Sequence, residues 1–411
     1  MTPFLLVALA AFALLAWKDH RRAFFLFVGL LPTYVIRFTV GGLPTTALEI
    51  LFWILFAGWM FKREKRFVDI QGWRLLMLLW LTVATVEAFV SPDLHAAAGV
   101  WKAYFIEPVM FFILANDVLR AAEDRAKVAI ALAWTAILLG AITTYQYFTH
   151  FAVPDPWNLP GQYRATAFYG FPNATGLFLA PLIPLFAWLS GQCAVGETKN
   201  RRRLILFLAA IVASFVAIVM VQSKGAAIGA TAGLIVLGLV NAKIRKPLIL
   251  GLAALAVIVA IIPVTRNLAV NTVTLNGWSG RVRKVMWSET WNMFKDHAIL
   301  GAGISGYPIV FDKYHEARYL EIFQYPHDIF LNFWSELGLA GVALLLWTLW
   351  LVFKSKQWPL IAVFTAIVVH GLVDVPYFKN DLSILWWLLL ALIVSQQAEL
   401  RKLNKLKNGK A

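Results

Sequence analysis

Several ionisable side chains interrupt an otherwise apolar chain, and their types suit the binding and transfer of a phosphate-linked group. They are Arg164, Lys224, Arg281, Arg283, His327 and Asp374. Arginine presents a planar fork of donors to phosphate oxygens, and its contacts strengthen near lipid because the dielectric constant falls there. A neutral histidine can take a proton from an incoming hydroxyl, since its unperturbed pKa is about 6.5. These residue types therefore predict a site for a membrane-anchored diphosphate, with His327 orienting or deprotonating the acceptor hydroxyl.

Each of these side chains also has a purely structural interpretation. Lys224 occupies the short turn Gln222-Ser223-Lys224-Gly225, where a lysine often anchors a helix end at the lipid headgroups. Arg281 and Arg283 fit the solvated face of a helix in a loop, and Asp374 fits a simple pair with a neighbouring base. The aromatic residues around them suit either stacking on sugar rings or the aromatic belt of a membrane protein.

The composition of the chain excludes an ordinary soluble domain. Hydrophobic residues make up 60% of the 411 residues, and charged residues make up only 14%. A membrane-spanning helix needs about 20 mostly apolar residues. Candidate runs lie near 3–17, 23–36, 46–61, 73–90, 100–117, 128–149, 174–190, 204–221, 226–242, 247–264, 335–354, 358–374 and 381–396.

These runs predict an all-α polytopic membrane protein with about 12–13 transmembrane helices. We expect residues 1–411 to form a single transmembrane domain, in which 265–334 form one long loop containing short helices. The first two runs are the shortest, and whether the first one spans decides on which side the N-terminus lies.

The net charge of +15 does not point to nucleic acid, because the basic residues recur in every second loop. Such an excess of Lys and Arg marks cytoplasmic loops. The clusters include Lys18, Arg21, Arg22, Arg120, Arg125, Arg201, Arg202, Arg203, Lys354 and Lys356. The alternation places the loop 265–334, and with it the predicted site, outside the cytoplasm of a multi-pass membrane protein.

Disulfide and metal chemistry are not indicated by the sequence. The single cysteine, Cys193, falls in a predicted cytoplasmic loop, and no His, Cys or carboxylate cluster has the spacing of a metal site. We therefore expect neither a metal ion nor a cofactor.

The long loop has recognisable local structure. Residues 282–294 have apolar side chains at helical spacing, and the glycines of 301–306 indicate a turn or a close approach of another backbone. Asp328 fits the N-cap of a helix that then enters the membrane. This arrangement would place His327 directly before a helix start, at the boundary between water and lipid.

Four motifs, taken in order along residues 160–396, resemble the O-antigen ligase and polymerase superfamily. They are Arg164 with Pro172-Asn173; Gln222-Ser223-Lys224-Gly225; Arg283-x-x-x-Trp287 with Gly301-x-Gly303-x-Ser305-Gly306-Tyr307; and His327-Asp328-x-x-x-Asn332 with Glu336-Leu337-Gly338-Leu339-x-Gly341. The helices before residue 160 fit this family only in their hydropathy. The resemblance implies an all-helical membrane glycosyltransferase, a multi-pass protein of the cytoplasmic (inner) membrane whose site faces the periplasm.

The resemblance also implies roles for individual residues. The family's arginine in a Ser-Arg-Gly-like turn falls on Lys224, which keeps the charge but loses the bidentate fork. The arginine four residues before a tryptophan falls on Arg283, and Arg281 is a plausible second contact. The family's His-Asn pair falls on His327-Asp328, so the candidate base is kept and its neighbour changes. The Gly-x-x-Asp pattern before the last span falls on Asp374.

The activity that the resemblance implies is an inverting, metal-independent transfer of a glycan from undecaprenyl diphosphate, as in lipopolysaccharide biosynthesis. In ligases the acceptor is a sugar of the lipid A core, and in polymerases it is another lipid-linked repeat unit. Beyond the donor, the acceptor and membrane lipids, no partner is expected. Three alternatives remain open: a repeat-unit polymerase, a protein O-glycosylation ligase, and a flippase that moves a lipid-linked glycan without chemistry.

Overall fold

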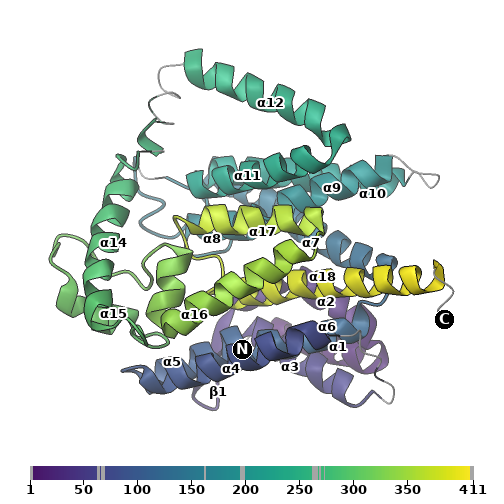
Figure 1. The fold of residues 1–411 in the computed structure, drawn as a ribbon, viewed down its shortest axis with the longest axis horizontal. Helices are drawn as coiled ribbons and strands as arrows, with labels where there is room; N and C mark the ends of the chain where they lie inside the picture. Colours follow the sequence, from purple (N-terminus) through teal and green to yellow (C-terminus); the bar gives the residue numbers. More distant parts are fainter. Residues whose placement is uncertain are drawn as a thin grey trace.

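The computed structural model describes residues 3–407, except 63–64, 66–69, 162, 195–199, 262–266, 268–269 and 273 (Figure 1). The described helices are α1 (Pro3–Lys18), α2 (His20–Gly29), α3 (Ala47–Met60), α4 (Gln71–Val90), α5 (Leu94–Trp101), α6 (Glu107–Val118), α7 (Ala122–Thr149), α8 (Pro172–Leu179), α9 (Leu182–Ala194), α10 (Arg201–Met220), α11 (Lys224–Val240), α12 (Ala242–Ile261), α14 (Trp278–Asp296), α15 (Tyr307–Phe311), α16 (Ile329–Lys354), α17 (Trp358–Gly371) and α18 (Asn380–Lys407). Single helical turns are η1 (Leu31–Val35), η2 (Lys102–Ile106) and η3 (Asp312–Tyr314). The strands β1 (Arg37–Val40) and β2 (Leu43–Thr46) form one antiparallel hairpin.

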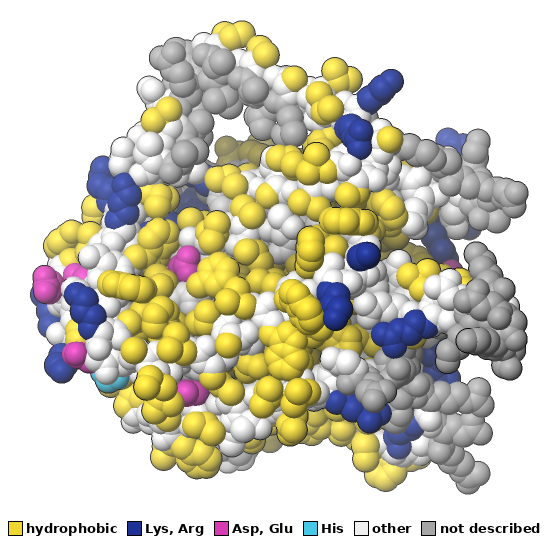
Figure 2. Space-filling view, in the orientation of Figure 1, with side chains coloured by type: hydrophobic (Ala, Val, Ile, Leu, Met, Phe, Trp, Pro, Cys, Tyr) yellow, Lys and Arg dark blue, Asp and Glu magenta, His cyan; other side chains and the backbone are white. Residues whose placement is uncertain are grey.

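The all-α polytopic prediction is confirmed. Among the described residues, seven helical segments are long and apolar enough to cross a membrane: α4, α5–α6, α7, α8–α9, α10, α16 and α18. Four shorter apolar helices, α1, α3, α11 and α17, lie among them. Figure 2 shows hydrophobic side chains over the middle of one face and charged side chains toward its two ends.

The predicted span 23–36 is wrong as a single helix. Helix α2 ends at Gly29, and the chain continues as the turn η1, in which Pro32 lies near the first position. Proline removes a backbone donor and cannot continue an α-helix without a break, so the segment bends instead of crossing straight. The last residues of the predicted span 247–264 and the first of the predicted loop 265–334 lie outside the described residues.

The basic clusters of several loops meet at one end of the helix bundle. Arg21 lies 2.5 Å from Asp124, and Arg203 lies 2.7 Å from Glu123. Arg125 pairs with Glu399 near the end of α18. Helices α14 and α15 lie at the opposite end (Figure 1). These basic residues from several loops therefore lie at the end of the bundle away from α14 and α15.

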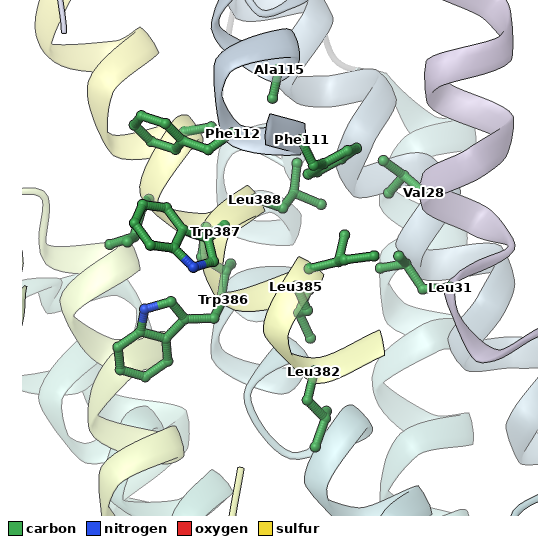
Figure 3. Close-up of a cluster of buried hydrophobic side chains, with 14 of the residues drawn as sticks. Val28, Leu31, Phe111, Phe112, Ala115, Leu382, Leu385, Trp386, Trp387 and Leu388 are labelled. Atoms are coloured by element: carbon green, nitrogen blue, oxygen red, sulfur yellow. The ribbon is translucent and has the colours of Figure 1, made fainter. Parts of the chain in front are cut away.

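Helix α18 is the most buried of the long helices and packs against α6. Figure 3 shows Phe112 of α6 beside Trp387 of α18, whereas Phe111 of α6 points toward Val28 of α2. The rings of Phe112 and Trp387 meet edge to face with their centroids 5.3 Å apart. Inside lipid such packing, rather than exclusion of water, holds helices together, and an aromatic pair contributes about 0.5–1.5 kcal/mol. The indole of Trp387 also donates to the hydroxyl of Tyr377 at 3.2 Å, which ties α18 to the loop that precedes it.

Helices α11 and α17 pack backbone against backbone. Gly225, Gly229 and Gly233 recur every four residues along α11 and so lie on one face. A Cβ atom added at Gly229 would lie 2.6 Å from the carbonyl oxygen of Ala366, and one added at Gly225 would meet His370 at 2.7 Å. Small residues permit this close approach between membrane helices. The start of α11 is thereby held beside the end of α17.

Replacing Gly229 by Leu is therefore expected to destabilise the protein. The new side chain has to push α11 away from α17, and overpacking of this kind costs on the order of 1–3 kcal/mol. The matched control is Gly251→Leu, because a Cβ added at Gly251 meets no atom within 4 Å. Thermal unfolding in detergent should show a lower midpoint for Gly229→Leu alone. Equal midpoints for the two variants would contradict the close packing.

The glycine-rich segment after α14 enters a break in α16. Gly338 has φ +61° inside α16, and Leu339 N–H donates to the carbonyl of Ile299 at 3.0 Å. Ala302 N–H donates to the carbonyl of Ser335 at 2.7 Å. The predicted close approach of another backbone near 301–306 is confirmed, and it ties the loop to α16.

Two further local predictions are confirmed. The predicted helix 282–294 is α14, which runs from Trp278 to Asp296. Asp328 caps α16, and its Oδ1 accepts from the N–H groups of Phe330 and Leu331, both at 2.9 Å. His327 thus lies directly before the first turn of α16.

Candidate functional site

Asp374, in the loop between α17 and α18, is the meeting point of three distant segments. Its Oδ2 accepts a hydrogen bond from Nδ2 of Asn173 at 2.9 Å. Its Oδ1 accepts from the N–H of Val375 at 2.9 Å and lies 3.4 Å from Nδ1 of His327. The start of α8, the start of α16 and the α17–α18 loop are therefore joined through one carboxylate.

Arg164 reaches this meeting point through Asn173. One terminal nitrogen of Arg164 donates to Oδ1 of Asn173 at 2.9 Å, and its Nε donates to the carbonyl of Val221 at 2.9 Å. The guanidinium lies over the ring of Trp157, 5.1 Å from the centroid. The other terminal nitrogen, NH1, makes no hydrogen bond with the described residues and remains available to a ligand.

Arg283 reaches the same loop from α14. Its Nε donates to the carbonyl of Val373 at 2.7 Å, and NH1 donates to the carbonyl of Ser279 at 3.2 Å. One turn further along α14, the indole of Trp287 donates to the carbonyl of Pro326 at 2.8 Å. Helix α14 therefore places one cation beside Asp374 and also holds the backbone just before His327.

The side chain of His327 lies partly exposed beside the buried carboxylate of Asp374. It is 29% exposed whereas that of Asp374 is 8% exposed, so the ring faces open space and the carboxylate does not. The residue adopts φ +48°, a left-handed conformation that a non-glycine residue adopts rarely and often at functional sites. The carboxylate at Nδ1 favours the tautomer with its proton there, which leaves Nε2 as a free acceptor.

The charges of the site perturb one another. Burial and the nearby charge of Arg283 lower the pKa of Arg164 to about 10, against the opposing effect of Asp374. Burial also lowers the pKa of Arg283, again against the effect of Asp374. Both guanidinium groups remain protonated at neutral pH, so the site presents two fixed positive charges.

The carboxyl group of Asp374 is held ionised. Burial alone would raise its pKa, but the hydrogen bond and charge of His327, with the charges of His370 and Arg283, hold the pKa well below its usual range. A depressed pKa stabilises the fold above the unfolded-state value of about 3.9, and this contribution is lost as the pH falls through the folded-state pKa.

Asp374→Asn is therefore expected to reduce the loss of stability that the protein shows as the pH falls into the acid range. The unfolding midpoint of the wild type should fall as the pH drops from about 5 toward 3, because the carboxylate takes up a proton on unfolding. The midpoint of the variant should be lower at neutral pH and fall less steeply. Asp312→Asn, at an exposed residue paired with Arg318, is the control. Parallel profiles for the wild type and Asp374→Asn would refute the coupling.

The structure brings four of the predicted site residues together, whereas Lys224 and Arg281 make no hydrogen bond or ion pair with these four. Arg164, Arg283, His327 and Asp374 converge. Lys224 is exposed at the first position of α11. It follows Gln222 by two residues, and Arg164 donates to the carbonyl oxygen of Gln222 at 3.4 Å.

Arg281 does not join the convergent group. It is exposed on α14, and its NH1 donates to the carbonyl of Asn276, at 2.9 Å, in the segment just before the helix. Side chains two residues apart on an α-helix are rotated by about 200° about the helix axis, so Arg281 and Arg283 lie on different faces of α14.

Two residues of the site carry no role in the sequence-based prediction. Asn173 stands in a motif, but its bridge between Arg164 and Asp374 is visible only in the structure. Lys379, in the loop before α18, is half-buried; burial lowers the pKa of its ammonium, and the charges of Asp381 and Asp374 raise it. An ionisable residue at the edge of a predicted span is the signal that could have drawn attention to Lys379.

Part of the chain matches a known family model. Residues 209–346 match a family model described as O-antigen ligase. The matched segment contains Lys224, Arg283 and His327, whereas Arg164 and Asp374 lie outside it. No curated protein matches the chain.

Proposed function

We propose that this chain, in which residues 209–346 match the O-antigen ligase family model, belongs to that superfamily and transfers a glycan from undecaprenyl diphosphate to a sugar hydroxyl of the lipid A core. The observation that carries the proposal is the convergence of Arg164, Arg283 and His327 on Asp374. We place the reaction on the periplasmic face of the inner membrane, at the end of the bundle where α14 and α15 lie, because the basic clusters lie at the other end.

The donor diphosphate would be bound by the two arginines. Each guanidinium is fixed by its Nε to a backbone carbonyl, that of Val221 for Arg164 and that of Val373 for Arg283. Each also keeps a terminal nitrogen that is not bonded to the described residues. Lys224, exposed at the start of α11, adds a third positive charge. A preorganised cluster of this kind stabilises the charge that develops on a leaving diphosphate.

The transfer would proceed with inversion. The acceptor hydroxyl attacks the anomeric carbon, and the bond from this carbon to the diphosphate oxygen breaks on the opposite face. The bonding electron pair leaves with undecaprenyl diphosphate, and Nε2 of His327 takes the hydroxyl proton. Asp374 stabilises the imidazolium that results, as a carboxylate behind a catalytic histidine does. In this scheme the arginines and Lys224 provide the electrostatic stabilisation that a metal ion provides in other transferases.

A transfer assay with three acceptors tests the assignment. The purified protein in lipid nanodiscs would receive an undecaprenyl-diphosphate-linked glycan and either lipid A core, a second lipid-linked repeat unit, or a peptide rich in Ser and Thr. We expect glycosylated lipid A core. Extension of the repeat unit alone would identify a polymerase instead, and modification of the peptide alone a protein O-glycosylation ligase. Movement of the donor across a bilayer without any transfer would identify a flippase.

A further inference from the structure

The apolar segment α5–α6 contains one turn of π-helix, η2. The N–H of Glu107 donates to the carbonyl of Lys102, five residues earlier, whereas an α-helix pairs residues four apart. Pro108 follows Glu107 and has no N–H, so the carbonyl of Tyr104, four residues before the proline, has no α-helical donor. The proline therefore deprives one backbone carbonyl inside the bundle of its usual partner.

The hydroxyl of Tyr377 supplies a donor to this carbonyl. It donates to the carbonyl of Tyr104 at 2.7 Å and accepts from the indole of Trp387 at 3.2 Å. The Tyr377 side chain is fully buried among aromatic rings. A buried hydroxyl that both donates and accepts is held in one orientation. Tyr377 therefore ties the loop between α17 and α18 to η2.

The loop that Tyr377 ties down carries the centre of the proposed site. Asp374 lies three residues before Tyr377, and its carboxylate lies 2.9 Å from Nδ2 of Asn173 and 3.4 Å from Nδ1 of His327. Three residues of extended chain span at most about 11 Å. A shift of the backbone at Tyr377 therefore reaches Asp374 directly.

A second contact holds the same loop from the N-terminal side. Nδ2 of Asn380, the first residue of α18, donates to Oε1 of Glu49 at 3.3 Å. The other carboxylate oxygen of Glu49 accepts from the hydroxyl of Thr45 at 2.7 Å and lies 3.2 Å from Nζ of Lys102. Lys102 is the first residue of η2. The contacts of Tyr377 and Asn380 therefore both lead to the π-turn.

We infer that Tyr377 is a positioning residue for the proposed transfer. Its bond to the Tyr104 carbonyl holds the loop between α17 and α18 where Asp374 meets His327. The hydroxyl bonds to Tyr104 and Trp387, so it acts on the reaction only through Asp374. This role extends the site to the N-terminal helices, which lie outside the matched segment 209–346. Its effect on the rate rests on the proposed function, whereas its effect on stability does not.

A double-mutant cycle tests the coupling without an assay of activity. Tyr377→Phe removes only the hydroxyl, and Asp374→Asn removes the charge beside His327. We expect Asp374→Asn to lower the unfolding midpoint less in the Tyr377→Phe background than in the wild type, because the loop no longer holds Asp374 against His327. Residues coupled through a shared backbone shift are non-additive in this way. Additive effects of the two substitutions would overturn the inference.

The matched control is Thr135→Val. Thr135 is buried, and its hydroxyl donates to the carbonyl of Gly29 at 2.7 Å, between α7 and α2. The substitution thus removes a bond of the same kind and length as that of Tyr377, but away from the loop. Its effect on the midpoint should add to that of Asp374→Asn, since distant sites are independent.

The transfer reaction gives the second readout. Tyr377→Phe should lower kcat by about twofold to tenfold, the effect of one hydrogen bond. It should raise KM for the lipid-linked donor less, because Arg164 is anchored to Val221, outside the loop. Thr135→Val should lower the unfolding midpoint without lowering kcat. A normal kcat for Tyr377→Phe, or equal losses of kcat in the two variants, would contradict a positioning role.

The failure of the proposed function is distinguishable from the failure of this inference. If the wild type transfers no glycan, the proposed function fails, and the cycle in unfolding midpoints still decides whether Tyr377 positions Asp374. If the wild type transfers glycan but the cycle is additive, the role of Tyr377 alone is wrong.

Discussion

Replacing Arg283 by Lys is expected to lower the rate constant of glycan transfer by about 10²-fold to 10³-fold, the usual effect of removing one preorganised donor from a charged transition state. Lysine keeps the positive charge of Arg283 but lacks its planar arrangement of hydrogen-bond donors. The Nε of Arg283 donates to the carbonyl of Val373 at 2.7 Å and thereby fixes the plane of the guanidinium beside Asp374. A lysine has no planar fork and cannot make this anchor while also reaching the diphosphate.

The matched control for this variant is Arg281→Lys. Arg281 lies two residues earlier on α14, is exposed, and bonds to the carbonyl of Asn276 instead of the α17–α18 loop. Single-turnover measurements with saturating donor should therefore show a loss for Arg283→Lys and near-normal rates for Arg281→Lys. Equal losses would mean that both arginines contact substrate, as the sequence alone predicts. Equal retention of activity would remove Arg283 from the mechanism.

Replacing His327 by Asn is expected to lower the transfer rate by about 10²-fold to 10⁴-fold, the range for loss of a general base. An asparagine places a polar atom near the position of Nδ1, beside Asp374, but provides nothing at the position of Nε2. Binding of undecaprenyl diphosphate, the product, should be nearly unchanged because the arginines are intact. A large loss of transfer rate together with unchanged binding of undecaprenyl diphosphate would identify a role of His327 in proton transfer.

The control for His327→Asn is His297→Asn. His297 follows α14, and its ring meets that of Tyr314 edge to face with the centroids 6.1 Å apart, away from the Asp374 contacts. The rate of glycan transfer should fall in His327→Asn and stay near normal in His297→Asn. A normal rate for His327→Asn would show that the acceptor hydroxyl needs no base at this position.

The membrane helices and their caps could be predicted because their signals are local. An apolar run of about 20 residues, the N-cap Asp328 and the glycines of 301–306 each act on neighbouring backbone, and the structure has all three. The bend within 23–36 could also have been anticipated, since Pro32 lies in the middle of that run.

The convergence of the site could not be predicted in the same way. Asn173 and Asp374 are 201 residues apart in the sequence, and Arg283 and Val373 are 90 apart. No periodicity within one sequence specifies such pairs, because they depend on which helices pack together. The glycines of α11 permit close packing against another helix, but their spacing does not specify that this helix is α17. The choice between Arg281 and Arg283 likewise depended on which face of α14 meets the α17–α18 loop.

The central claim is that this chain joins a glycan to an acceptor by using two arginines and His327 around Asp374. The most direct measurement is transfer of a labelled glycan from undecaprenyl diphosphate to lipid A core by the purified protein in nanodiscs. The account predicts labelled lipid A core and release of undecaprenyl diphosphate by the wild type, with at least about a hundredfold lower rate for Arg283→Lys. Absence of labelled product with the wild type, or equal rates for the wild type and Arg283→Lys, would contradict it.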